Sequence, residues 1–213
     1  MKMKNRTKVI IAVVIIIILL ASILFIYSST WKTILGTVQD AKKKVTVEPG
    51  MIRFSQPYKG ISFTHSLWIY VDDWSYRNME EKYILSNDKF KMFLGKQNNN
   101  LYIEIPLEKT NHPERIVYEN LPLQKWVNIV LILDNRNLDL WLNGKLYHSR
   151  HLSNVPAFQE NKAIEYTPHR GFSGHISRIY HYERPITKKT IESIFLLGPI
   201  SYNPFIRLYE FFK

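Results

Sequence analysis

The chain has 213 residues, of which 14% are aromatic, a formal net charge of +11 and no cysteine. The lack of cysteine excludes a disulfide scaffold, a cysteine-ligated zinc site and a thiol nucleophile. About 170 residues follow the first 44, enough for one domain with a hydrophobic core, and their aromatic content favours a β-sandwich or barrel over a helical bundle.

The N-terminus combines a basic segment with an apolar run. Residues 1–8 carry no acid, and their basic residues are Lys2, Lys4, Arg6 and Lys8. Residues 9–27 form an apolar run of 19 residues, in which Ser22 is the only strongly polar side chain. As a helix this run would be about 28 Å long, close to the ~30 Å core of a bilayer. It predicts one transmembrane helix; a secretory signal peptide, the competing interpretation, usually has a shorter apolar region and a small-residue cleavage site.

Residues 28–44 are predicted to form a basic juxtamembrane stalk. Its consecutive lysines are Lys42, Lys43 and Lys44. Near anionic headgroups each charge is worth ~1 kcal/mol, and a solvated linker is the alternative. Lysines on both sides of the predicted span leave its orientation open. The region after the span has no Asn-x-Ser/Thr sequon, which is consistent with a cytosolic or virion-internal domain.

From residue 45, turn residues recur about every 8–12 positions between short runs of β-forming residues. This spacing is typical of an all-β sandwich or barrel. The expected strands are Ile52–Phe54, Ile61–Val71, Lys82–Ser86, Phe90–Leu94, Leu101–Ile105, Ile116–Tyr118, Trp126–Leu133, Leu138–Leu142, Lys145–His148, Ile164–Tyr166 and Gly174–Tyr182.

Three of these strands are expected to form a meander. Trp126–Leu133 is largely apolar on both faces, which indicates a central strand covered on both sides over part of its length. Leu138–Leu142 alternates cleanly between apolar and other residues. Asn143 and Gly144 then provide the two positive-φ residues of a type I′ turn into Lys145–His148.

The last strand and the segment after it carry two further signals. Gly174–Tyr182 breaks its alternation, which predicts a bulge or a switch between sheets. A short helix follows, with Thr187 as its N-cap. Its apolar stripe, expected to seal one end of the sandwich, consists of Ile191, Ile194 and Phe195.

The order of these segments resembles the laminin-G-like, concanavalin-A-like jelly roll. The segments that carry the resemblance are Phe63–Val71, Ile84–Asn87, Pro122–Val130, Leu138–Leu146 and Gly171–Tyr180, followed by the helix. The resemblance covers residues 50–198 and implies two curved antiparallel sheets, so we assign 45–198 to a jelly-roll domain. The sequence of Pro122–Asn128, combined with a bare N-terminal anchor, is also similar to versions of this domain in large double-stranded DNA viruses.

Glucanases of this fold carry catalytic carboxylates at alternate positions of one strand, where the side chains share a face. Glu104 and Glu108 have this spacing, but Pro106 occupies the place of the helper aspartate. Proline also disfavours a central strand. We interpret both glutamates as solvated acids at a strand end and expect no enzymatic activity.

Laminin-G-like domains often hold calcium or a glycan at a loop edge. The calcium candidates in this chain are Asp72, Asp73 and Asp88, and the glycan candidates are Trp74 and Tyr76. A polar turn after the Phe63 strand, with Trp74 covering the sandwich edge, is the alternative. We expect no other cofactor, and no module for specific nucleic-acid binding is recognisable.

Residues 199–213 form an aromatic C-terminal tail that would pack on the domain, lie in the membrane interface or dock on a neighbouring protein. The sequence as a whole predicts a non-enzymatic, single-pass membrane-anchored structural or interaction module. We expect a minor capsid or membrane-associated virion protein that links a bilayer to a protein shell, located in a virion or an internal host membrane. A membrane-anchored, lectin-like carbohydrate-binding protein is the alternative.

Overall fold

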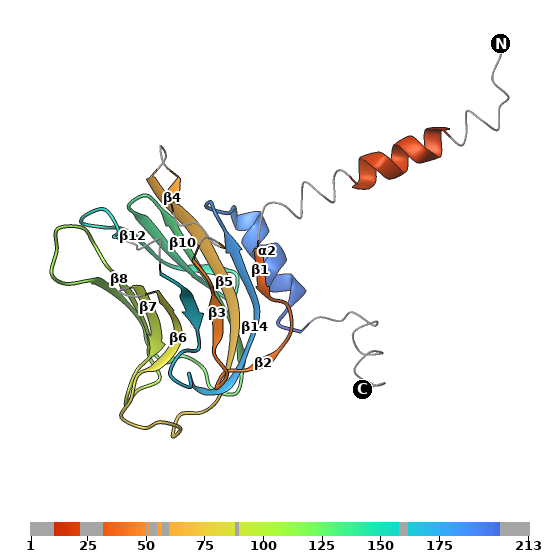
Figure 1. Ribbon diagram of the computed structural model, residues 1–213. Helices are drawn as coiled ribbons and strands as arrows, with labels where there is room; N and C mark the ends of the chain where they lie inside the picture. Colours follow the sequence, from red (N-terminus) through yellow and green to blue (C-terminus); the bar gives the residue numbers. More distant parts are fainter. Residues whose placement is uncertain are drawn as a thin grey trace, which may run out of the picture. The chain divides into compact units, whose positions relative to one another are not determined.

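The computed structural model describes residues 11–21, 32–49, 51, 55–56, 60–87, 90–157 and 162–200. The chain divides into two compact units, Met1–Lys32 and Thr33–Lys213. In the first unit, residues 11–21 form a helix (Figure 1). Within the described ranges, no helix is long and apolar enough to cross a membrane. The remaining residues of the predicted span, 9–10 and 22–27, lie outside the described residues.

The second unit is a sandwich of two antiparallel sheets (Figure 1). The larger sheet contains β1 (Lys32–Leu35), β2 (Gln39–Asp40), β4 (Ser55–Gln56), β5 (Gly60–Asp73), β10 (Trp126–Asp134), β11 (Asn137–Leu142), β12 (Lys145–His151) and β14 (Ser173–Tyr182). Its order is β1-β14-β5-β10-β11-β12, with β2 paired to β14 and β4 paired to β5.

The smaller sheet contains β3 (Val45–Val47), β6 (Lys82–Asn87), β7 (Phe90–Leu94), β8 (Leu101–Ile105), β9 (Glu114–Tyr118) and β13 (Ile164–Tyr166). Its order is β3-β13-β6-β7-β8-β9. The predicted all-β, two-sheet sandwich is therefore confirmed. The strand expected at Ile52–Phe54 and the tail from residue 201 lie outside the described residues.

Strand β10 shows why this sequence forms a sandwich. One face of the strand contributes Val127, Ile129, Leu131 and Leu133 to the core between the sheets. On the opposite face, Val130 and Ile132 form a second apolar cluster with Ile191. Strand β10 lies between β5 and β11, so the prediction of a central strand covered on both faces is confirmed.

The predicted local features of the larger sheet are also present. Asn143 (φ 50°) and Gly144 (φ 75°) form the left-handed turn between β11 and β12. In β14 the register against β5 shifts between Ser177 and Tyr180, and Arg178 between them has φ 44°. The broken alternation in this strand therefore marks a bulge.

Helix α2 (Lys188–Leu197) begins at the predicted cap, where the Thr187 side chain accepts a hydrogen bond from the Thr190 N–H at 3.4 Å. The expectation that it seals one end of the sandwich is wrong. Instead it packs on the outer face of the larger sheet, where Ile191 meets Val130 and Ile132. Val130 and Ile132 point away from the core, so they are buried only when another apolar element packs over them.

Strands β1 and β2 lie within the range that the sequence predicts to be a stalk. Both pair with β14, and Ala41, which follows β2, is fully buried. The Ala41 N–H donates to the Gly174 carbonyl at 2.9 Å. The sandwich therefore includes residues before the predicted domain boundary at residue 45.

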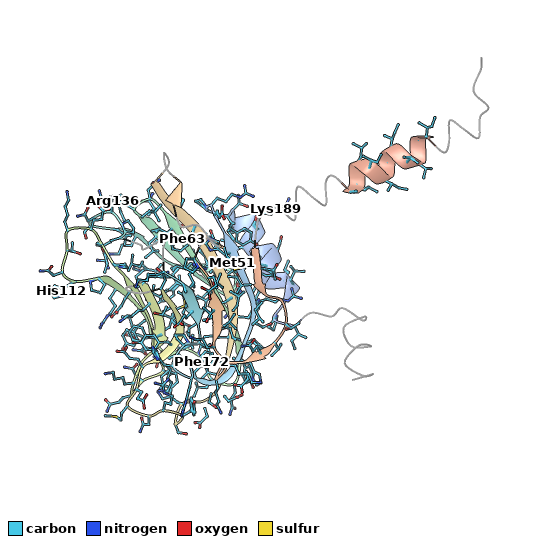
Figure 2. The ribbon with its side chains drawn as sticks, in the orientation of Figure 1. Met51, Phe63, His112, Arg136, Phe172 and Lys189 are labelled. Carbon is cyan, nitrogen blue, oxygen red and sulfur yellow. The ribbon has the colours of Figure 1, made fainter. Side chains whose placement is uncertain are left out.

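One part of the interior is polar. His65 and His181 are fully buried between the sheets near Phe63, which Figure 2 labels. The Tyr166 hydroxyl lies 3.2 Å from His65 Nδ1, and His181 Nδ1 lies 3.4 Å from the same atom. Burial, and secondarily the charge of His181, hold the pKa of His65 well below its ordinary value. His65 is therefore neutral at physiological pH.

Candidate functional site

The predicted rim residues lie in the last positions of β5 and in the turn after it, and the structure gives two of them local roles. The Asp73 carboxylate accepts hydrogen bonds from the Ser75 hydroxyl and from the Ser75 N–H, the latter at 2.9 Å. These bonds lower the pKa of Asp73, chiefly through the hydroxyl. Trp74 packs against the core, and Lys82 Nζ lies 4.7 Å from its ring centroid. Asp73 thus stabilises the turn, and Trp74 covers the sandwich edge.

Tyr76 and the lysine run also contact the domain. Lys42 Nζ lies 4.7 Å from the Tyr76 ring centroid, a cation–π geometry. Lys44 Nζ forms an ion pair with Glu165 Oε1 at 2.7 Å. The Lys43 carbonyl accepts a hydrogen bond from Thr167 Oγ1 at 2.7 Å. The structure therefore ties all three predicted headgroup-binding lysines to the sandwich by a side chain or a carbonyl.

No group of three or more His, Asp or Glu side chains suited to a metal ion occurs in the described part of the chain. Asp88 lies outside it. Its neighbour Asn87 is buried, and the Asn87 amide donates to the Lys162 carbonyl at 2.9 Å. Calcium binding at this edge stays a prediction.

A cluster that the sequence analysis did not identify lies on the outer face of the larger sheet. We call Tyr70, Trp126 and His175 the outer aromatic cluster. Tyr70 is the register partner of both other residues, and its ring centroid lies 5.5 Å from Trp126 and 6.2 Å from His175. Asp72 Oδ2 lies 4.0 Å from His175 Nδ1, and both side chains are about half exposed. Aromatic faces beside a carboxylate and an imidazole suit recognition of a polar ligand.

Gly174 makes this cluster possible. Its φ is +149°, and a Cβ at this position would lie 1.9 Å from the Tyr70 carbonyl oxygen. Glycine therefore lets β14 approach β5 closely where Tyr70 and His175 meet. In the sequence, the only sign of this cluster was a glycine inside a predicted strand, which indicates a close approach of another backbone. It does not reveal which neighbouring strand makes that approach.

The glutamates of the glucanase-like spacing do not share a strand. Glu104 lies in β8, which ends at Ile105, and Glu108 is exposed in the following turn. The interpretation of Glu104 as a solvated acid is wrong, because it is only 9% exposed and accepts a hydrogen bond from Arg115 Nε at 2.9 Å. Arg115 lies opposite it on β9, a pairing across strands that the sequence does not show.

The outer face of the smaller sheet, which we call the open face, carries two rows of paired side chains. A charged row runs across β7, β8 and β9 as Lys91, Glu104 and Arg115. An aromatic row beside it consists of Tyr83, Phe93 and Tyr102. The Phe93 and Tyr102 rings are stacked with their centroids 5.3 Å apart.

Tyr83 lies at the end of the aromatic row. Burial, helped by a hydrogen bond to Glu81 Oε2 at 2.6 Å, raises the pKa of Tyr83 to about 12. The only helix described in the second unit, α2, covers the other sheet. The open face therefore presents charged and aromatic groups without a covering element from the described residues.

Comparisons with known proteins give a matching family model and similar solved structures. A laminin G-type family model, described as the concanavalin A-like lectin/glucanases superfamily, matches residues 40–192. No curated protein matches the chain.

Similar solved structures include binding domains of botulinum neurotoxins and of Paraclostridial Mosquitocidal Protein 1. The binding domain of botulinum neurotoxin DC, solved with rat synaptotagmin II, is 17% identical with a TM-score of 0.58 over 78% of this chain and 46% of that chain. The receptor-binding domain of the botulinum neurotoxin C/D mosaic is 14% identical with a TM-score of 0.61, over 79% and 46%. The binding domain of Paraclostridial Mosquitocidal Protein 1 is 16% identical with a TM-score of 0.59, over 78% and 45%. The chain thus spans about half the length of these structures, and the likeness shows a shared fold.

Proposed function

The chain belongs to the concanavalin A-like lectin/glucanases superfamily, and we propose that it is a non-enzymatic binding module held at a membrane by its N-terminal apolar run. Its partner is a protein layer beside the bilayer, so that the protein links the two, as a minor capsid or membrane-associated virion protein does. Some similar structures are receptor-binding domains by name, and we carry over only the general role of binding.

The observation that carries the proposal is the open face. It combines half-buried Tyr83 and Tyr102 with the paired charges of Glu104 and Arg115. Aromatic and arginine side chains are enriched in protein–protein interfaces, and charged groups that complement a partner set its orientation. The open face and the face under α2 belong to different sheets of the sandwich, which suits a protein that contacts two layers.

The non-enzymatic part of the proposal is supported by the position of the two glutamates. A glucanase needs two free carboxyl groups that flank the scissile bond at a fixed separation. Glu104 is instead bonded to Arg115, and Glu108 lies beyond the end of its strand.

The test is chemical cross-linking with mass spectrometry on the native membrane or particle. We expect cross-links from Lys91, on the open face, to a neighbouring structural protein. A Val117→Lys variant places a charge on the same face opposite Tyr102 and should weaken those links. Lys109→Glu, in the exposed turn after β8, is the matched control and should leave them unchanged. Cross-links confined to the chain itself would contradict the proposal.

Carbohydrate binding is the second candidate, and the outer aromatic cluster favours it. A sugar ring would stack on Trp126 or Tyr70 and hydrogen-bond with Asp72 and His175. We expect Trp126→Ala to abolish any glycan-array signal and Trp74→Phe, at the rim, to retain it. An array without signal, both with and without calcium, would exclude this candidate.

A further inference from the structure

The last turn of α2 exposes aliphatic side chains. Leu196 is 82% exposed, Leu197 is 59% exposed, and Ile200, just beyond the helix, is 45% exposed. The opposite side of the same helix buries Ile191 and Ile194 completely or nearly so. The helix therefore carries apolar groups on two sides, and only one side is explained by packing on the sheet. We call Leu196, Leu197 and Ile200 the helix-end patch.

Hydrogen bonds hold the backbone beside this patch in place. The Ser177 hydroxyl donates to the Pro199 carbonyl at 2.6 Å, and Arg178 Nη2 donates to the Ile200 carbonyl at 3.0 Å. Both donors lie at the bulge of β14, which turns Arg178 into the left-handed region. Bulges often re-aim a side chain in this way. The exposure of the patch is thus built into the fold rather than produced by a fraying helix end.

Exposed lysines lie on the same helix and on the hairpin beside it, although none is in the last turn of α2. Lys188 and Lys189 are in the first turn, at the opposite end of the helix from the patch, and Figure 2 labels Lys189. Lys145 is exposed in the β11–β12 hairpin, where a Cβ on Gly144 would lie 3.3 Å from the Phe195 ring. The acid on α2 is Glu192, which lies 3.7 Å from Lys188. A helix that exposes aliphatic groups at its end and lysines elsewhere on its surface resembles the amphipathic helices that bind anionic membrane interfaces.

We propose that the helix-end patch inserts into the interface of an anionic bilayer, so that the domain contacts the membrane directly as well as through its anchor. This inference rests on the proposed membrane anchoring. A bilayer is the occupant that fits, because lipid adapts to side chains that project from a helix end, whereas a protein partner needs a matching hollow. The apolar sequence from Tyr202 onward continues the chain from the same point.

The experiment uses the cysteine-free chain to place one fluorescent label at a time. Full-length protein with Leu196→Cys carries an environment-sensitive dye and is reconstituted into phosphatidylcholine vesicles with or without 30% phosphatidylserine. Lipids with a shallow spin label report contact by quenching. His112→Cys is the matched control, because His112 is exposed in the loop between β8 and β9, away from Lys189 in Figure 2.

We expect the label at position 196 to be quenched about threefold more than the label at 112, with the difference growing when phosphatidylserine is present. Equal, weak quenching at both positions would overturn the inference. A label at 196 that iodide cannot reach but lipid does not quench would also overturn it, and would show that the tail or a second copy covers the patch.

A label at position 18, in the N-terminal apolar run, separates the inference from the proposed function. Quenching of Ile18→Cys by deep spin-labelled lipids without quenching at 196 leaves the anchor in place and rejects the patch. No quenching at position 18 rejects the proposed anchoring itself. Leu196→Asp provides a second readout, because its 82% exposure means that the fold should tolerate the charge while quenching at a label on residue 197 falls.

Discussion

The two sheets cover their outer faces by different means. On the larger sheet, Val130 and Ile132 point outward and are buried by Ile191 of helix α2. On the smaller sheet no described helix takes part, and Phe93 reaches 4% exposure because neighbouring side chains enclose it. A helix can cover a largely apolar face, but its own far side and its end stay exposed. Lateral packing needs long polar or aromatic side chains, whose outer parts stay at the surface.

The largest effect should come from the helix-covered face. Ile191→Ala removes a fully buried side chain and should lower the free energy of unfolding by about 3 kcal/mol. Leu196→Ala, on the same helix but 82% exposed, should change it by less than about 0.5 kcal/mol. Urea unfolding of the full chain in a nonionic detergent measures both. Equal losses would show that α2 does not dock as described.

The laterally packed face should be less sensitive. Phe93→Ala should cost about 2 kcal/mol, below the usual loss for a phenylalanine in a core, because the Tyr83 and Tyr102 rings can close over the gap. Phe93→Leu keeps most of the apolar volume and should lose less than about 1 kcal/mol. The same urea titration applies. A loss greater than that of Ile191→Ala would reverse the ranking of the two faces.

Acid should act on the interior rather than on either face. The pKa of His65 is lowered by burial, so between pH 7 and 5 the unfolded chain binds a proton that the folded chain does not. Stability should therefore fall as the pH falls below about 6.5, by at most about 1.4 kcal/mol per pH unit from this group. The lowered carboxyl pKa values of Asp73 and Glu80 contribute only at lower pH.

His65→Leu should flatten this pH dependence, whatever its effect on stability at neutral pH. Chemical unfolding at half-unit steps from pH 7.5 to 5 gives the slope. An unchanged slope in the variant would show that other groups cause the loss of stability.

The smallest expected effect concerns the charged row of the open face. Glu104→Gln keeps the side-chain size but removes the charge that faces Arg115, and should cost about 1 kcal/mol because Arg115 is half exposed. Combining it with Arg115→Gln in a double-mutant cycle isolates the pair. The coupling should shrink at high salt. A coupling free energy that salt does not change would show that the pair is less accessible to solvent than described.

Periodicity explains why much of the larger sheet was predictable. Leu138 to Leu142 alternates strictly. The type I′ turn that follows needs positive φ at both central residues, and Asn143-Gly144 is one of the few dipeptides that adopt it readily. Both features are local, so neighbouring residues are enough to specify them. The N-cap at Thr187 was found for the same reason.

The features that the sequence did not reveal depend on which strands become neighbours. The outer aromatic cluster exists because β14 and β10 lie on either side of β5, which brings His175 and Trp126 to Tyr70. The Glu104–Arg115 pair likewise depends on the pairing of β8 with β9. Strand β2 has only two residues and lies beside a lysine run, so neither length nor hydrophobicity indicates a strand.

Strand β14 is attached to both ends of the domain, which determines how the protein would bear tension. Its first strand, β1, pairs with β14, and the Ile200 carbonyl is held by Arg178 of β14. A pull between a point before Lys32 and a point after Ile200 would therefore enter the larger sheet through this one strand. The four residues of β1 would separate first, and residues 32–38 would then extend to at most ~25 Å before β2, which also pairs with β14, carried the load.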